Sequence, residues 1–262
     1  MRLEFLGTGA ADYNLERDCN DAEFRRFSCM MVNDSILIDP GPHIFHYAET
    51  FGKKNLFDKV KTVLITHSHG DHLNPDSVRR LAELCPNCTF AGNAASLETL
   101  QNAGVEVPYT VLTPFERYTF GDAVIVPMFA NHYTGRYDEQ ALLYSIELEG
   151  KKLYYGTDTG WLPAATWEYI CTQRYDAMVF ELTIGEASYD FRIFTHTGID
   201  MLKIMLRTIR HRDKKHYDTT NFGCKIFTTH HAKTLHPDQA TLAATLAPLN
   251  VVPAYDGFVT EF

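Results

Sequence analysis

The sequence predicts a layered α/β protein in which helices lie outside and sheets lie within. Residues 60–66 are largely β-branched and apolar, as expected for a buried strand. Residues 199–210 carry apolar side chains at helical spacing, which indicates a helix packed on one face. No repeat, low-complexity tract or Pro/Ser-rich linker interrupts the chain, so we expect one continuous domain over residues 1–262.

The first part of the chain combines predicted strands with two predicted helices. Asn33-Asp34 is a turn signal between two short apolar runs. Asn74 suits a helix N-cap, and Pro75 suits the first helical position. Strands are expected at residues 3–6, 29–33, 35–39, 60–66 and 89–91, and helices at residues 74–84 and 94–103.

The second part returns to strands before its helices begin. Residues 109–157 have a strand pattern that ends in a strand at 152–156. Further strands are expected at residues 177–182 and 225–229, one or two more at 251–262, and helices at 199–210 and 236–246. Two sets of strands with helices between them favour the layered architecture.

The composition excludes three classes of protein. A hydrophobic fraction of 45% with 17 Phe and 14 Tyr is too apolar for a disordered chain. No uninterrupted apolar stretch reaches the length of about 18 residues that a membrane-spanning helix needs. The 24 Lys+Arg against 33 Asp+Glu give a charge of −9, which argues against a nucleic-acid binder. The 12 histidines are not explained by composition.

The N-terminal residues and the cysteines give expectations about the cellular compartment of the protein. The chain opens without a basic region that leads into a long apolar one, so we expect cytoplasmic residence. The six cysteines are scattered, and Cys85 and Cys88 form the one CxxC pair. A redox or zinc role would need a second pair or a thioredoxin-like setting, so two thiols at a helix end are the simpler interpretation.

A dense group of candidate metal ligands follows the strand predicted at 60–66. His67, His69, Asp71 and His72 lie within six residues, and burying them without partners would be costly. Imidazole and carboxylate suit zinc, manganese or iron, but one short turn cannot bring all four side chains to one ion. His67 and His69 point the same way on extended backbone and can share a metal, while Asp71 and His72 can reach a second.

This motif, His-x-His-x-Asp-His after a strand, resembles the signature of the metallo-β-lactamase fold hydrolases. Other segments match the family in the same order along most of the chain. They are Leu6-Gly7-Thr8-Gly9, residues 36–41, Asn131-His132, residues 155–160 and Thr228-Thr229-His230. The resemblance implies a four-layer αββα sandwich.

The resemblance also implies a dinuclear metal site. Its ligands would be His67, His69 and His132 for metal one, Asp71, His72 and His230 for metal two, and Asp158 between them. Two divalent ions would hold a bridging hydroxide as the nucleophile, and Asp71 would take part in catalysis. Zinc is favoured, with manganese or iron as alternatives.

The last ligand could be either of two neighbouring histidines. The family places it directly after the threonine pair, which favours His230 over His231. His231 would then be a surface residue or a residue behind the ligands. The sequence assigns no role to His43, His46, His211, His216, His231 and His236.

The segments 180–183 and 194–198 resemble the Glu…His pair of the phosphodiesterase branch of this family. That branch includes tRNase Z and the phosphoribosyl 1,2-cyclic phosphate phosphodiesterase of the phosphonate pathway. His196 would act as a general acid for a poor alkoxide leaving group, and Glu181 would orient it and keep it charged. The alternative is that His196 begins a helix and has no chemistry.

The resulting hypothesis is a dinuclear phosphodiesterase for a small cyclic or linear phosphate ester. A lactone or thioester hydrolase on the same fold is the alternative enzyme, and a non-catalytic metal-binding sensor or assembly module is the alternative of another class. The chain has no Gly/Lys-rich arm with which to grip tRNA, so nucleic acid is disfavoured. No membrane partner is expected, and a homodimer is common among such hydrolases.

Substrate contacts are sought in the loop at residues 16–26 and after the ligands. Arg25 and Arg26 could offer bidentate contacts to a phosphate, although a solvated charged loop is an equal alternative. Arg136 and Lys233 are further candidate contacts. Aromatic residues that follow the ligands, Tyr133, Tyr137 and Trp161, are candidates for stacking on a base or sugar.

Overall fold

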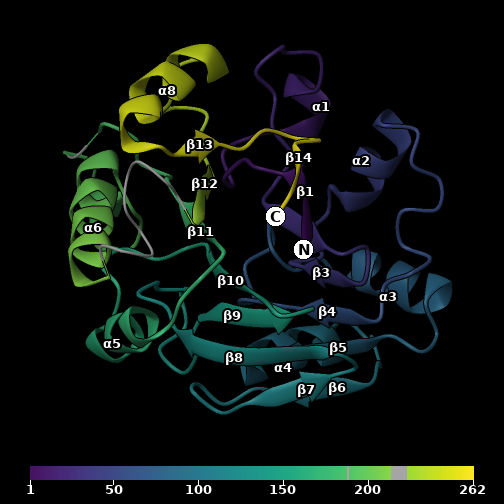
Figure 1. Ribbon diagram of the computed structural model, residues 1–262. Helices are drawn as coiled ribbons and strands as arrows, with labels where there is room; N and C mark the ends of the chain where they lie inside the picture. Colours follow the sequence, from purple (N-terminus) through teal and green to yellow (C-terminus); the bar gives the residue numbers. More distant parts are fainter. Residues whose placement is uncertain (188, 214–222) are drawn as a thin grey trace.

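Two seven-stranded sheets make up the centre of the protein in the computed structural model, which describes residues 1–187, 189–213 and 223–262 (Figure 1). The first sheet has the order β14 (Val259–Glu261), β1 (Arg2–Gly7), β2 (Cys29–Val32), β3 (Ile36–Ile38), β4 (Thr62–Leu64), β5 (Thr89–Gly92) and β6 (Tyr109–Val111). Its pairing is antiparallel from β14 to β3 and parallel from β3 to β6.

The second sheet is built in a similar way from the rest of the chain. Its order is β13 (Val252–Pro253), β12 (Lys225–Thr229), β11 (Ala177–Glu181), β10 (Lys151–Gly156), β9 (Leu142–Leu148), β8 (Ala123–Phe129) and β7 (Tyr118–Phe120). Here β10 to β13 are parallel, and β7 to β10 are antiparallel.

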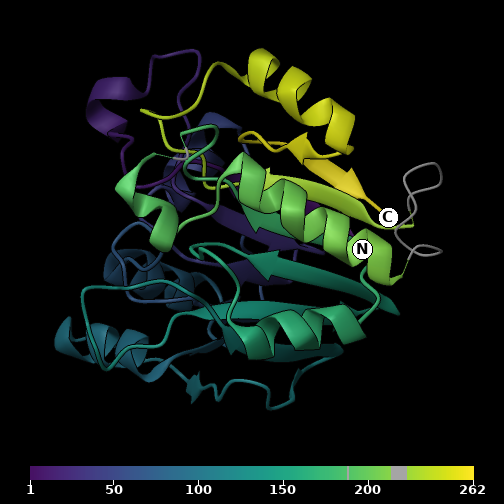
Figure 2. The ribbon, with the colours of Figure 1, turned by 90° about the vertical axis from the view of Figure 1, so that its left-hand side faces the viewer.

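Helices cover the outer face of each sheet (Figures 1 and 2). The helices α2 (Ile44–Thr50), α3 (Pro75–Leu84) and α4 (Ala94–Asn102) share an apolar core with the first sheet. The helices α5 (Ala164–Thr172), α6 (Ile199–Arg212) and α8 (Gln239–Leu246) share another with the second sheet. The short elements α1 (Leu15–Asp18), η1 (Phe191–Phe194) and η2 (Ala247–Leu249) lie in the connections.

A third core fills the space between the sheets. Alternate strand residues point to opposite faces, so Leu3 and Phe5 of β1 enter this inner core while Leu6 enters the outer one. In β3 the outward residue is Leu37. One apolar core lies between the two sheets, and one lies between each sheet and its helices. This is the four-layer αββα sandwich that the family resemblance implies, so the predicted fold class is confirmed.

Several local predictions also agree with the structure. Asn33 and Asp34 both adopt positive φ at the β2–β3 turn, and the Asn74 side chain accepts a hydrogen bond from the Ser77 N–H at 2.9 Å. The strand expected at 60–66 is shorter, because only Thr62–Leu64 pair on the ladder. The helices α2 and α5 were not predicted, and their N-caps make no side-chain hydrogen bond.

The sheets bring several strand ends to one edge of the sandwich. The strands β10, β11 and β12 are parallel, and β8 runs in the same direction because two antiparallel pairings separate it from β10. The segments that follow the carboxyl ends of such strands meet at one edge, where open α/β sheets bind their ligands. Here they carry His132, Asp158 and His230, and Glu181 is the last residue of β11 at the same edge.

Two observations concern regions away from this edge. Among the described residues, no helix combines the length and the apolar character needed to cross a bilayer. The thiols of Cys85 and Cys88 are free and buried, and burial raises the pKa of Cys88 to about 12. Unreactive thiols packed at the end of α3 agree with the simpler interpretation of this pair.

Candidate metal centre

The first ligand set, which is His67, His69 and His132, gathers three imidazoles from two loops. His67 and His69 follow β4, and His132 follows β8. His67 Nε2 lies 2.9 Å from His69 Nδ1, which lies 3.2 Å from His132 Nε2. Nitrogens bound to one tetrahedral zinc at about 2.0–2.1 Å lie roughly 3.4 Å apart, so this set has the spacing of ligands that share an ion.

The second ligand set, which is Asp71, His72 and His230, joins the same loop to the end of β12. His72 Nε2 lies 3.3 Å from His230 Nε2 and 3.2 Å from Asp71 Oδ2. His230 Nε2 lies 3.6 Å from the same carboxylate oxygen. Both imidazoles are buried, so these groups face one another rather than solvent.

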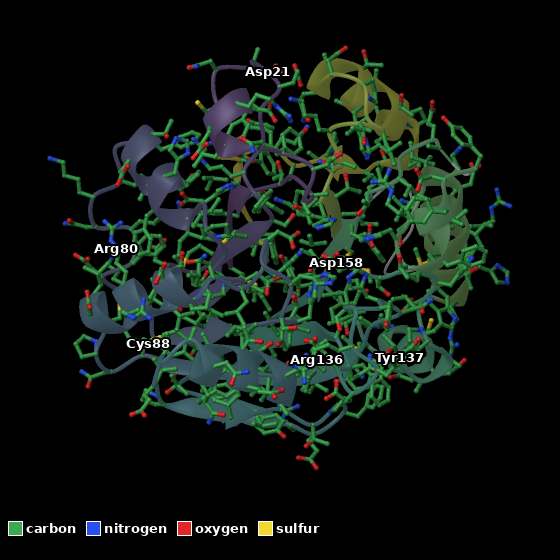
Figure 3. The ribbon with its side chains drawn as sticks, turned by 180° about the vertical axis from the view of Figure 1, so that it is seen from behind. Asp21, Arg80, Cys88, Arg136, Tyr137 and Asp158 are labelled. Carbon is green, nitrogen blue, oxygen red and sulfur yellow. The ribbon has the colours of Figure 1, made fainter. Side chains whose placement is uncertain are left out.

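Asp158 lies between the two sets, at the centre of the view in Figure 3. Its Oδ2 is 2.9 Å from His72 Nε2 and 3.2 Å from His230 Nε2, and its Oδ1 is 3.6 Å from His132 Nε2. Oδ2 is buried, and none of the described residues, His72 included, reaches it with the geometry of a hydrogen bond. A buried carboxylate oxygen directed at imidazole nitrogens is a costly arrangement unless a cation lies between them.

Acceptors behind the ligands fix the ring orientation of four histidines. The Nδ1 atoms of His67, His72, His132 and His230 lie 2.7–3.3 Å from acceptors on Thr66, Asp39, Thr195 and Thr183. A ring that donates through Nδ1 presents its Nε2 lone pair to the centre, which is how proteins usually prepare metal-binding histidines. The donors therefore fit divalent cations in both sets.

The two sets differ in charge. Burial pulls the pKa of His72 down, but Asp158, Asp71 and Asp39 outweigh burial and hold this pKa well above its usual value. In the first set, burial keeps the pKa of His67 well below its usual value and lowers that of His132 to about 4. Burial therefore favours the neutral form of His67 and His132 in the first set.

Backbone strain marks the same region. Asp39, Asp158 and His230 adopt φ values of 61°, 50° and 57°. Such conformations are uncommon for residues other than glycine, and they persist where the surroundings impose them, often at functional sites. Asp39 and His230 directly follow the strands β3 and β12, and Asp158 lies two residues after the end of β10. These turns at strand ends place the three side chains at the same edge of the sandwich.

Two carboxylates that the sequence analysis did not single out support the ligand loop. Asp39 is fully buried and accepts hydrogen bonds from the Thr66 N–H at 2.8 Å and from His72 Nδ1 at 2.9 Å. Glu139 is half-buried and accepts from the N–H of Ser68 at 2.8 Å and from its hydroxyl at 2.5 Å. Ser68 lies between His67 and His69, so Glu139 holds the loop without touching a ligand.

The predicted pair Glu181 and His196 lies beside both sets. His196 Nδ1 is 3.0 Å from Glu181 Oε1, and the His196 ring centre is 4.9 Å from that of His132. Burial lowers the pKa of His196, but Glu181 and Asp158 outweigh it and raise this pKa to about 9. Glu181 also accepts from the Thr159 N–H at 2.7 Å, which ties the pair to the segment of Asp158.

The structure brings His230, and not His231, next to His72 and Asp71. His231 is fully buried, so it is not the surface residue that the sequence allowed, and its Nε2 contacts Thr228 Oγ1 at 3.0 Å. Burial holds its pKa well below the usual value. His216, which has no assigned role, lies outside the described residues.

The cations proposed to bind substrate have protein partners instead. Arg25 and Arg26 are each only 5% exposed, so neither alternative for them, a phosphate contact or a solvated loop, agrees with the structure. Arg25 donates to Thr8 Oγ1 and to the Ala254 carbonyl. Arg26 pairs with Asp256 at 3.2 Å. Their guanidinium groups tie the N-terminal loop to the C-terminal segment.

The other two candidates are paired at the surface. Arg136 contacts Glu98 at 2.5 Å and Asp138 at 2.9 Å, and Lys233 contacts Asp18 at 2.8 Å. Their role as substrate contacts stays a prediction. In the view of Figure 3, Arg136 and Tyr137 lie below the buried Asp158.

The candidate metal centre lies within the part of the chain that matches a known protein family. A family model described as the beta-lactamase superfamily domain matches residues 34–248. That range includes every residue of both ligand sets, Asp158, Glu181 and His196.

Solved structures match over nearly the whole chain. The metallo-beta-lactamase fold protein YhfI from Bacillus subtilis is 16% identical, with a TM-score of 0.70 and 99% of each chain covered. Human tRNase Z, short form, is 17% identical, with a TM-score of 0.68, and 100% of this chain and 99% of that chain are covered. Zn(2+)-bound PqqB from Methylobacterium extorquens is 14% identical, with a TM-score of 0.74 and full coverage of both chains. At these identities the likeness concerns the fold.

Proposed function

The chain belongs to the beta-lactamase superfamily and has the metallo-β-lactamase fold, and from this premise we propose that it is a hydrolase that uses two divalent metal ions to cleave small phosphodiesters. The observation that carries the phosphodiester assignment is the contact of His196 with Glu181 beside the ligands, at 3.0 Å. The likeness in fold to human tRNase Z supports this chemistry, because cleavage of RNA breaks a phosphodiester.

The metal ions would be held by the two ligand sets and shared through Asp158, with zinc favoured over manganese or iron. Bound there, two divalent cations lower the pKa of water and neutralise charge that develops on a phosphoryl group. The protein orients the imidazoles that would bind these ions through acceptors on four residues, which are Thr66, Asp39, Thr195 and Thr183. Asp71 completes the second set.

A proton donor is the second requirement. An alkoxide leaves a phosphodiester poorly unless a proton reaches its oxygen, and a positioned acid is worth about 10²- to 10⁴-fold in rate. His196 has a pKa raised to about 9 and is therefore protonated at neutral pH. Its Nδ1 donates to Glu181, so Nε2 carries the proton that is transferred. When that proton leaves, Glu181 keeps the ring in place to take up another.

The size and charge of the substrate follow from the rest of the molecule. The net charge of −9 would repel a polyanion such as nucleic acid during encounter. Arg136 and Lys233 are already paired with carboxylates, so the metal ions would carry most of the interaction with the phosphate. We therefore propose a small cyclic or linear phosphate ester as the substrate.

The test compares two leaving groups in metal-loaded protein. The His196→Ala variant should hydrolyse a nucleoside cyclic phosphate, which releases an alkoxide, about 10²- to 10⁴-fold more slowly. Bis-p-nitrophenyl phosphate releases a stable phenolate, so its hydrolysis should suffer far less. His211→Ala, at the exposed far end of α6, is the matched control and should leave both rates unchanged.

Elemental analysis accompanies the kinetics. We expect about two metal ions per chain in both the wild type and the His196→Ala variant, which separates the loss of an acid from the loss of a ligand. Equal losses on the two substrates would contradict the acid role. Hydrolysis of lactones or thioesters without any phosphodiester turnover would support the alternative enzyme, and metal uptake without any turnover would support a non-catalytic sensor or assembly module.

A further inference from the structure

Six exposed aromatic side chains belong to the loops that carry the metal centre. These residues, here called the aromatic rim, have exposed fractions of 50% for Tyr133, 98% for Tyr137, 47% for Trp161, 90% for Tyr189, 82% for Phe191 and 78% for Phe194. Among the other described residues, no large apolar side chain is more than 51% exposed. The ring centres of Tyr133 and Tyr137 lie 5.3 Å apart. Neighbouring exposed apolar side chains are typical of a binding site.

Hydrogen bonds hold three loops of the rim together next to the ligands. The Gly160 N–H donates to the Asn131 carbonyl at 3.0 Å, and Asn131 Nδ2 donates to the Phe194 carbonyl at 3.3 Å. A side chain at Gly160 would lie 2.9 Å from that same carbonyl, so the two loops are in close contact.

The rim residues on these loops are near neighbours of the chemical groups. Tyr133 directly follows His132, which is a metal ligand. Phe194 lies two residues before His196, the proposed acid, and its short helix η1 stands at the edge of the molecule at the left of Figure 2. The rim residues therefore lie close along the chain to the groups that would hold the metal ions and to the proposed acid.

Trp161, which belongs to the rim, also lines a neighbouring apolar hollow. This hollow has a volume of about 360 Å³, and its other walls come from the start of α5 and the middle of α6. The other lining residues are Leu162, Ala164, Trp167, Ile204, Met205 and Thr208. This volume lies within the usual range for small-molecule sites, and the lining offers a single hydroxyl and no charged group.

The charges around the rim are compensated. Arg136 pairs with Glu98 and Asp138, and Arg192, four residues before His196, pairs with Asp190 at 2.8 Å. A substrate arm with further phosphates would have to break such pairs, whereas an uncharged arm would not. The surface next to the centre is therefore suited to an apolar group.

We propose that the aromatic rim binds an uncharged aromatic substituent of the substrate. The preferred substrate would then be a singly charged phosphodiester, with its phosphate at the metal centre and an aromatic ring system stacked on Trp161 and Phe194. This inference rests on the proposed function for the nature of the reacting group. The ring acts as a handle that contributes to binding before and during the reaction.

The test uses two ligands that contain no ester bond, so binding is measured whether or not the protein cleaves phosphodiesters. Metal-loaded wild type should bind (1-naphthyl)methylphosphonate at least about tenfold more tightly than methylphosphonate in calorimetry, since stacking on an aromatic side chain is worth about 5- to 150-fold. Binding of the naphthyl ligand should also change the fluorescence of Trp161.

Two rim variants and one control assign this advantage to the rim. Trp161→Ala and Phe194→Ala should each remove most of it while leaving the affinity for methylphosphonate unchanged. Phe194→Ala keeps the backbone carbonyl that Asn131 binds, so the loops stay joined. Leu84→Ala, at a side chain 48% exposed at the end of α3 in the other helical layer, should retain the full advantage.

Three results would overturn the proposal. The first is equal affinity of the wild type for the two phosphonates, and the second is an equal loss in Leu84→Ala. The third is a change from dimer to monomer in Phe194→Ala during sedimentation, with the naphthyl advantage intact, because the rim would then be a contact between two copies of the chain. Tight naphthyl binding without phosphodiester turnover would support the rim and contradict the proposed function.

Discussion

The two ligand sets lie side by side but differ in charge and in their support. The first set consists of three imidazoles on loops, with burial lowering the pKa values of His67 and His132, and a half-buried carboxylate holds one of these loops. The second set surrounds His72 with carboxylates, one of which, Asp39, is fully buried. The second set can therefore attract a cation by charge, and the first depends on nitrogen lone pairs.

This difference explains the position of Asp158. A divalent cation in the first set would meet no negative charge of its own, since all three members are imidazoles. Asp158 directs Oδ1 to His132 and Oδ2 to His72 and His230. In the proposed dinuclear centre, its single carboxylate would supply negative charge to the first set and add to that of the second, and would so join two unlike sites.

The largest expected effect therefore comes from Asp158→Asn, which keeps the shape of the side chain and removes its charge. We expect metal content to fall below two ions per chain, with the first set emptied first. Turnover should fall by more than about 100-fold, the upper cost of losing a group behind a ligand. Elemental analysis and kinetics measure both quantities. Asp34→Asn, at an exposed carboxylate in the β2–β3 turn, is the control, and an equal loss there would contradict the assignment.

Asp39→Asn tests the support of the second set. Asp39 contacts His72 directly and reaches His67 only through the Thr66 hydroxyl. Removing the charge should weaken metal binding at the second set by about 10- to 100-fold and at the first set by less. Calorimetric titration of metal-free protein resolves the two steps, and a His69→Ala variant identifies the step that belongs to the first set. A larger loss of metal affinity at the first set than at the second would contradict the assignment of Asp39 to the second set.

The sequence predicts the ligands much better than their supports. The spacing of His67, His69, Asp71 and His72 is visible because a single turn carries all four. Glu139 acts on this turn from 71 positions away, through a fold contact that has no pattern in the sequence. Asp39 belongs to a segment that resembles the family, but its contact with His72 also depends on the parallel pairing of β3 with β4.

The same distinction applies to the fold. The helix α3 was predictable because Asn74 and Pro75 provide local start signals, and the structure uses both. The helices α2 and α5 begin at His43 and Pro163, which make no side-chain cap, and packing on the sheets stabilises them instead. Arg25 and Arg26 were misplaced for a related reason, because their partners come from the C-terminal segment.

Glu181→Gln should change the pH dependence of the reaction. Glu181 raises the pKa of His196 against the effect of burial, so a neutral amide should lower that pKa from about 9. The acid must be protonated to act, and the alkaline fall in kcat should therefore begin at a lower pH in the variant. The pH profile of kcat on a cyclic nucleotide measures this shift. If the alkaline limb of the pH profile were unchanged, Glu181 would not set the pKa of the group that acts as the acid.

The smallest expected effect concerns Glu139, the support of the first set. Its Oε1 accepts from the Ser68 N–H and from Asn93 Nδ2, and its Oε2 accepts from the Ser68 hydroxyl. Glu139→Ala removes all three hydrogen bonds, but the site is half-buried, so water can replace them. We expect metal affinity at the first set to fall by less than about tenfold, below the usual cost at a group that touches a ligand.

Glu139→Gln separates position from charge in this support. The amide oxygen can still accept from the Ser68 N–H, and the Ser68 hydroxyl can turn to accept from the amide nitrogen. Affinity at the first set should therefore stay close to that of the wild type. Glu98→Gln, at an exposed carboxylate on α4 that pairs with Arg136, is the matched control. Metal affinity at the first set could instead fall as much in Glu139→Gln as in Glu139→Ala. Glu139 would then contribute its charge as well as its position, and the contrast in charge between the two ligand sets would no longer hold.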